Sequence, residues 1–147
     1  MLGTKSRYAV TAMLDLALKK GEDPVCISDI AVRQELPENY LEQLFSKLRR
    51  AGLVESTRGK KGGYRLSREP EAISVSEVIL AVDASLKATA CSSRRGCRHK
   101  GVTCLSHDLW EGLERHVESY LSAFSLKDVI KGKTDAINLF RGDLSHG

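Results

Sequence analysis

The sequence has few aromatic residues and no long apolar run, and each shortage excludes a class of protein. Aromatic residues make up 5% of the 147 residues and charged residues 29%, which suits a helical soluble protein better than a β-sandwich, a membrane protein or a disordered chain. The longest apolar runs are only a few residues long, so the sequence predicts neither a membrane span nor a signal peptide. We therefore expect a cytoplasmic protein with no membrane partner.

The sequence also lacks the motifs of an enzyme, since it contains no nucleotide-binding fingerprint and no nucleophile–base arrangement. We therefore expect that the protein is not an enzyme. At 147 residues, the chain has about the length of one ordinary domain, so further large burial would come from self-association. A homodimer built on one core per chain is the expectation.

The first half of the chain is predicted to form three helices. Residues 5–20 place apolar side chains at helical spacing, and residues 28–34 form a short second helix with Ser28 as its N-cap. A third helix opens near Pro37 and ends at Gly52. Its apolar stripe consists of Leu41, Leu44, Phe45 and Leu48.

Two short β-prone runs, residues 53–57 and 63–67, follow the third helix. The basic segment 58–62 joins them, which is typical of a hairpin with a positively charged tip. Two helices around a short turn and then a basic hairpin make a winged helix-turn-helix. Residues 74–83 form a further helix, and we assign residues 1–83 to this DNA-binding domain.

Positive charge is concentrated on the predicted third helix and wing, because residues 44–68 contain eight Lys or Arg and one acid, Glu55. If the apolar stripe faces the core, the opposite helix face is suited to base edges and phosphates of a double-stranded DNA operator. An ordinary solvated helix face is the alternative, and the helix, turn, helix and hairpin in succession argue against it. The candidate DNA-binding residues are Asn39, Tyr40, Glu42, Gln43, Ser46, Lys47, Arg49, Arg50, Arg58, Lys60 and Lys61.

Glu42 is the one acid among these candidates. A carboxylate repels phosphate but can accept a hydrogen bond from cytosine N4. We expect Glu42 to act as a filter that tolerates a cytosine and disfavours other bases by about 1–3 kcal/mol.

The remaining candidates are metal ligands. Thiols of a cytosolic protein are more often metal ligands or catalytic groups than disulfide partners. Wide C-x5-C-x6-C-x2-H spacing, without a C-x2-C pair, favours an iron–sulfur cluster over zinc. His107 is preferred to His99 because it lies at the predicted start of a helix. The candidate ligands are Cys91, Cys97, Cys104 and His107. Cys26 lies in an apolar stretch, and we expect it to be a small buried hydrophobe.

A long amphipathic helix is predicted after the cysteines, because apolar residues recur at helical spacing from Leu105 onward. An apolar stripe of this length has to be buried against another part of the protein or a second chain. We assign residues 84–107 to a cluster-binding loop, 105–130 to a dimerisation helix and 131–147 to a flexible tail. The expected fold class is mainly α, a winged helix-turn-helix with a small β-hairpin wing.

Four segments carry a family resemblance: KSRYAVTAMLDLAL, YLEQLFSKLRRAGLVESTRGKKGGYRL, SVSEVILAVD and the cysteine run that ends in CLSHDLW. Over roughly residues 4–130 the chain resembles the Rrf-type winged-helix regulators. The resemblance implies a 2Fe-2S cluster on the four candidate ligands and dimerisation through the long helix. It also implies that Glu42 discriminates between classes of DNA site. The gap between Cys97 and Cys104 is one residue longer than the family pattern, which leaves a 4Fe-4S cluster as the alternative.

The expected function is that of a cluster-sensing transcriptional regulator that binds palindromic DNA as a homodimer. The resemblance implies that the holo form represses genes of iron–sulfur cluster assembly, while the apo form regulates other promoters. The assembly machinery would be the source of the cluster. We expect cluster binding to order residues 91–107 and so set the tilt of two recognition helices. A zinc-bound or cluster-free constitutive regulator is the first alternative, and an iron–sulfur redox protein is the second.

Overall fold

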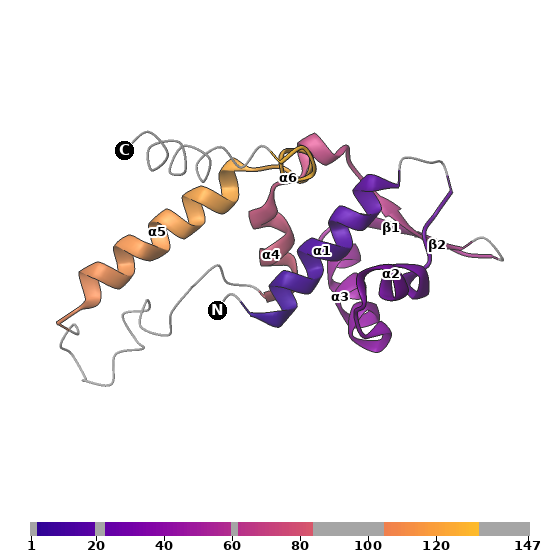
Figure 1. Ribbon diagram of the computed structural model, residues 1–147, viewed down its shortest axis with the longest axis horizontal. Helices are drawn as coiled ribbons and strands as arrows, with labels where there is room; N and C mark the ends of the chain where they lie inside the picture. The colour runs from indigo at the N-terminus through magenta and orange to yellow at the C-terminus, as the bar shows by residue number, and fades with distance from the viewer. Residues whose placement is uncertain (1–2, 20–22, 60–61, 84–104, 133–147) are drawn as a thin grey trace.

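The computed structural model describes residues 3–19, 23–59, 62–83 and 105–132. Within these ranges the chain is mainly helical and has one antiparallel hairpin (Figure 1), which confirms the predicted fold class. The elements are α1 (Thr4–Leu18), α2 (Ile27–Gln34), α3 (Glu38–Arg50), β1 (Val54–Thr57), β2 (Gly63–Leu66), the 3-10 helix η1 (Pro70–Ala72), α4 (Val75–Asp83), α5 (His107–Ala123) and α6 (Leu126–Ile130).

The core lies where α1 packs against α3 and α4. Met13 of α1 and Val78 of α4 are fully buried. The four apolar residues of the α3 stripe are at most 2% exposed, so the stripe faces the core as predicted. Each side chain buried in this way contributes roughly 1.5–3 kcal/mol to folding. The opposite face of α3 is therefore presented to solvent.

A partly buried ion pair links α2 to α1. The Asp15 side chain is 4% exposed and accepts hydrogen bonds from Arg33 Nε at 3.1 Å, Arg33 Nη2 at 2.7 Å and Gln34 Nε2 at 2.9 Å. Burial alone would raise the pKa of Asp15, but the hydrogen bonds and the positive charges of Arg33 and Lys19 outweigh it and lower the pKa. The ion pair fixes the angle at which α2 leads into the turn before α3.

The turn between α2 and α3 depends on Glu35, which adopts the left-handed conformation at φ 54°. Pro37 then occupies the N-cap position of α3. The sequence predicted Ser28 as the N-cap of α2, but the helix begins at Ile27 and its N-cap is Cys26. Cys26 is also exposed, so the prediction of a buried hydrophobe is wrong. It lies at a helix end, where its Sγ contacts the Gly62 carbonyl oxygen at 3.2 Å.

The wing is tied to the segment before α2. In the hairpin, Val54 pairs with Leu66 and Thr57 with Gly63. The backbones of Val25 and Tyr64 exchange two hydrogen bonds of 2.8 Å, which adds a third short strand-like segment. A Cβ on Gly63 would lie 2.5 Å from the Val25 carbonyl oxygen, so this close approach requires glycine.

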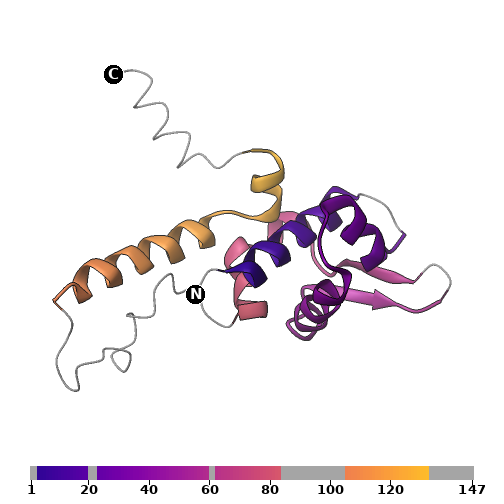
Figure 2. The same cartoon turned by 60° about the horizontal axis from the view of Figure 1, so that its bottom comes forward.

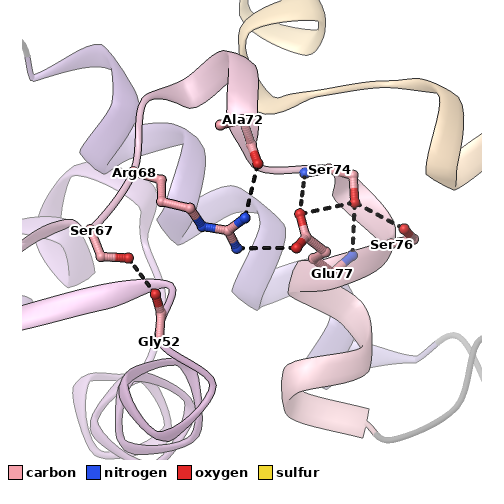
Figure 3. A network of polar contacts seen from close by, with 7 residues as sticks. All are labelled: Gly52, Ser67, Arg68, Ala72, Ser74, Ser76 and Glu77. Carbon is pink, nitrogen blue, oxygen red and sulfur yellow. Dashed lines mark hydrogen bonds and ion pairs between the residues drawn. The ribbon is translucent and has the colours of Figure 1, made fainter.

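A polar network joins the end of the wing to α4 (Figure 3). The Arg68 guanidinium donates to the Ala72 carbonyl and to Glu77 Oε1, both at 3.1 Å. The Ser74 N–H donates to Glu77 Oε2 at 2.9 Å, and the Glu77 N–H donates to Ser74 Oγ at 3.2 Å. This reciprocal pair is a capping box, and it sets the first residue of α4.

The predicted dimerisation range 105–130 contains two helices instead of one. α5 ends at Ala123 because Phe124 and Ser125 are extended and pair with the strand-like segment before α4. The Val75 N–H donates to the Phe124 carbonyl at 2.9 Å. α6 then starts on a Ser125 capping box and returns to the core, where Leu126 is fully buried.

α5 projects away from the winged-helix unit, and its N-terminal end is the part farthest from that unit in both views (Figures 1 and 2). None of its residues is buried within the single chain. In the parts of the chain that the structure describes, no helix is both long and apolar enough to cross a membrane.

Candidate DNA-binding surface and metal centre

The solvent-facing side of α3 forms a shallow hollow. It is lined by Asn39, Glu42, Gln43, Ser46, Lys47 and Arg50, all six of which are candidate DNA-binding residues. All except Lys47 are exposed, and Arg49 is exposed beside them. Lys47, Arg49 and Arg50 lie in the last turn of α3, where cations also interact favourably with the helix dipole.

Two candidates on α3 have contacts within the chain. Tyr40 is half-buried, and its ring packs edge-on against Tyr8 of α1 with centroids 5.6 Å apart. Lys47 Nζ donates to the carbonyl oxygen of Val82, near the end of α4, at 3.4 Å. Tyr40 therefore packs α3 on α1, and Lys47 links the solvent-facing side of α3 to the end of α4.

Of the candidates on the wing, Arg58 is exposed at the end of β1, while Lys60 and Lys61 lie outside the described residues. Arg65 pairs with Glu55 across the hairpin at 3.4 Å. Phe45 of α3 packs against Tyr64 of β2 with ring centroids 4.9 Å apart. This ring contact packs the wing against α3, so the two candidate DNA-binding elements lie side by side.

The residue that precedes α5 organises the start of that helix. Cys91, Cys97 and Cys104 lie outside the described residues, whereas His107 is the first residue of α5. Ser106 is the N-cap, and its Oγ accepts a hydrogen bond from the Trp110 indole N–H at 2.9 Å. The indole therefore holds the turn that presents His107.

His107 is mostly buried, with 13% of its side chain exposed. Its Nε2 lies 3.7 Å from Glu111 Oε2, one turn along the helix. Its Nδ1 is buried and has no hydrogen-bond partner among the residues that the structure describes. A buried polar nitrogen without a partner is rare in native proteins and is the atom at which a missing ligand or ion is expected. An imidazole nitrogen in this state fits a metal centre that includes thiolates.

The sequence analysis did not identify Glu111 as a candidate residue. His107, Asp108 and Glu111 offer ligand atoms within 4.8 Å of one another. Both acids are exposed, and Asp108 lies in the first turn, where a carboxylate also stabilises the helix dipole, so they do not by themselves define a metal site. The i, i+4 spacing of His107 and Glu111 in the sequence would have predicted their contact.

A family model described as "Rrf2: Iron-dependent Transcriptional regulator" matches residues 2–132. The chain belongs to the Rrf2 family. The HTH-type transcriptional regulator IscR of Aliivibrio salmonicida is 52% identical to this Rrf2-family protein over 129 residues, 88% of this chain and 76% of that regulator. The IscR of Xenorhabdus nematophila is 50% identical over 132 residues, 90% of this chain and 80% of that regulator.

Solved structures of the same family share the fold. T. potens IscR superposes with a TM-score of 0.73 at 38% identity, over 92% of this chain and 90% of that one. CymR (YrzC), the global cysteine regulator of B. subtilis, superposes with a TM-score of 0.74 at 36% identity, over 88% and 95% of the two chains. These relatives are transcriptional regulators and not enzymes, and the protein is an IscR-like transcriptional regulator. IscR and the cysteine regulator CymR share this fold, so the fold alone does not determine which signal a member senses. That specificity depends on the residues of the functional site.

Proposed function

We propose that this regulator senses an iron–sulfur cluster held by Cys91, Cys97, Cys104 and His107, and binds palindromic operator DNA as a homodimer. The observation that carries the proposal is the buried Nδ1 of His107, which has no hydrogen-bond partner among the described residues and lies three residues after Cys104 in the sequence. Three thiolates and one imidazole are soft donors that select iron–sulfur clusters or zinc over hard cations. When bound, the cluster supplies a redox-active group, and the fraction of protein that carries it depends on how much cluster is available.

The cluster type follows from the residues only in part. Four protein ligands suit a 2Fe-2S cluster, and a 4Fe-4S cluster is the alternative. The cluster-assembly machinery would deliver it, and the holo protein would repress the genes of that machinery. The apo protein would regulate other promoters. Two relatives named IscR, each about half identical to this chain, support this part of the proposal.

DNA binding is proposed for the exposed face of α3 and the wing. The hollow on α3 combines amide, hydroxyl and carboxylate groups with the cations of the last turn. Base edges would meet the N-terminal part of the helix, while Arg49, Arg50 and the basic wing would meet phosphates. Binding through phosphates predicts that the affinity falls steeply with salt concentration.

The dimer is proposed to form through α5. Leu109 and Leu113 are 65% and 42% exposed on this helix, which has no buried residue in the single chain. An amphipathic helix of this length has to bury its apolar stripe against a partner. A second copy of α5 meets that requirement and would set the separation of the two α3 helices.

Anaerobic purification followed by visible spectroscopy and by iron and sulfide analysis tests the cluster. We expect a coloured protein with iron and sulfide in equal amounts, and EPR of the reduced protein distinguishes 2Fe-2S from 4Fe-4S. DNA binding is then measured for holo and apo protein on a panel of palindromic sites. Colourless protein with one zinc per chain, or equal affinities of holo and apo protein for every site, would contradict the proposal.

A further inference from the structure

The two ring nitrogens of His107 lie in different surroundings. Nε2 is 3.7 Å from the Glu111 carboxylate, whereas Nδ1 is buried without a partner in the described part of the chain. A neutral imidazole carries its proton on one nitrogen and can ligate a metal through the other. The nitrogen that keeps the proton is normally held by a carboxylate, a carbonyl or water.

We propose that His107 binds the cluster through Nδ1 and that Glu111 is the positioning residue that holds Nε2 and so orients the ring. This inference rests on the proposed function, because it assigns an atom and a supporting residue to one of the four ligands. Glu111 itself does not touch the cluster.

The role of Glu111 follows from where its side chain lies. Its carboxylate is 51% exposed and pairs with His107 one turn back on the same helix. A pair with one solvent-exposed partner contributes little to the stability of a fold. The same contact fixes one torsion of a ligand ring that is largely buried, so its effect should be seen in the cluster and not in the folding of the chain.

The surrounding turn supports this assignment. The Trp110 indole N–H donates to Ser106 Oγ at 2.9 Å, which fixes the backbone turn immediately before His107. Two side-chain pairs at i, i+4, Ser106 with Trp110 and His107 with Glu111, therefore hold the first turn of α5. The Ser106–Trp110 pair positions the backbone, and the His107–Glu111 pair orients the imidazole ring.

The ligating nitrogen can be identified with histidine labelled with 15N at Nδ1 only, incorporated into the full chain. Pulsed EPR of the reduced, cluster-loaded protein should show that the strongly coupled nitrogen carries the label. Strong coupling from an unlabelled nitrogen, with the label only weakly coupled, would overturn the assignment and leave His107 a ligand. Absence of any strongly coupled histidine nitrogen would overturn both this inference and the proposed function.

The positioning role is tested with Glu111→Ala, and Glu118→Ala serves as the matched control. Glu118 lies two turns further along α5 and is also an exposed glutamate. We expect Glu111→Ala to lose its cluster to a chelator about tenfold faster than the parent protein, as when the outer-shell partner of a metal ligand is removed. Its midpoint potential should rise, because a negative charge near the cluster is lost. Glu118→Ala should match the parent protein in both measurements.

A conservative variant separates positioning from simple loss of structure. Glu111→Gln keeps a side-chain oxygen where the carboxylate lies 3.7 Å from Nε2, so this variant should retain the cluster better than Glu111→Ala. Thermal unfolding of the apo proteins should be the same for all variants within error. A Glu111→Ala protein that keeps the parent rate of cluster loss and the parent potential would overturn the role of Glu111, whichever nitrogen is the ligand.

Discussion

The Asp15–Arg33 ion pair predicts that a second substitution can repair the damage of a first. Asp15 is 4% exposed and Arg33 is 34% exposed, so the two partners differ in how well water can replace the lost contact. Arg33→Met removes both guanidinium hydrogen bonds and leaves a buried carboxylate held mainly by Gln34. Leaving a buried acceptor without its partner costs about 1–3 kcal/mol, and because Arg33 is partly exposed and the bond from Gln34 remains, we expect a loss of about 2 kcal/mol.

Asp15→Asn in the Arg33→Met background removes the unpaired buried charge. The double variant should therefore be about 1 kcal/mol more stable than Arg33→Met alone, even though it carries one more substitution. Urea unfolding followed by circular dichroism, with all four proteins of the cycle, measures this difference. The reasoning would be refuted if Asp15→Asn made Arg33→Met less stable.

The pH dependence of stability gives an independent check on the same pair. The pKa of Asp15 is lowered in the folded protein, so the folded state favours the ionised carboxylate. The stabilisation is complete above the unfolded-state pKa of about 3.9 and is lost as the pH falls through the lower folded-state pKa. The stability gap between parent and Arg33→Met should accordingly narrow in acid. If the difference in stability between the parent protein and Arg33→Met stayed constant from neutral pH to acid, the carboxylate charge would not contribute to that difference.

Four further substitutions test the DNA-reading face, the link to α4, the wing and the dimer. Glu42→Ala should relax base preference by about 1–3 kcal/mol at one operator position, measured over a panel of mutated sites. Ser6→Ala removes the 3.3 Å contact from Ser6 Oγ to Asp83 at the end of α4 and should reduce the ratio of holo to apo DNA affinity. Gly63→Ala should destabilise the fold by about 1–3 kcal/mol in urea unfolding. Leu113→Glu should give a monomer in analytical ultracentrifugation, because it places a charge in the apolar stripe.

Each of these substitutions has a control, which lies in the same helix for all but Gly63. Glu38→Ala removes another exposed acid of α3 and should leave base preference unchanged. Thr11→Ala removes a hydroxyl of α1 that bonds only within its own helix in the contacts observed, and should keep the holo-to-apo ratio. Gly112→Ala meets no atom within 4 Å and should stabilise α5 by about 0.5–1 kcal/mol. Arg115→Glu lies away from the apolar stripe and should remain dimeric. If a control behaves like its test variant, the contact assigned to that test residue is not the cause of the measured change.

The spacing of apolar residues predicted the helices and strands of the winged-helix unit. It did so because the conformation that each segment favours locally is also the one that buries its apolar side chains in the core. The α3 stripe recurs at helical spacing, and all four of its residues are buried. The two β-prone runs also pair in the expected hairpin. The break after α5 was harder to predict, because Phe124 and Ser125 become extended to pair with residues more than forty positions earlier.

Side-chain partners were less predictable than elements. Tyr40 lies on α3 beside the base-reading residues, but its ring contacts Tyr8 of α1, a pairing that periodicity within one helix does not encode. The bond between Asp15 and Arg33 also crosses between helices, and nothing local in the sequence couples them. Cys26 has apolar neighbours and yet is exposed, because it caps α2 instead of lying inside an element.

The segment between α4 and α5 connects two structurally distinct points, and this arrangement constrains how a cluster can act. Its first end follows Asp83, which contacts Ser6 of α1, and Val82, whose carbonyl oxygen accepts from Lys47 on α3. Its other end leads into His107, at the end of α5 farthest from the winged-helix unit (Figures 1 and 2). In the proposed function, a group bound by residues from this segment and by His107 would therefore act on α3 through the end of α4 and on the proposed dimer through α5. It follows that substitutions at Ser6 should alter coupling without altering cluster content, whereas substitutions at Glu111 should alter cluster retention first.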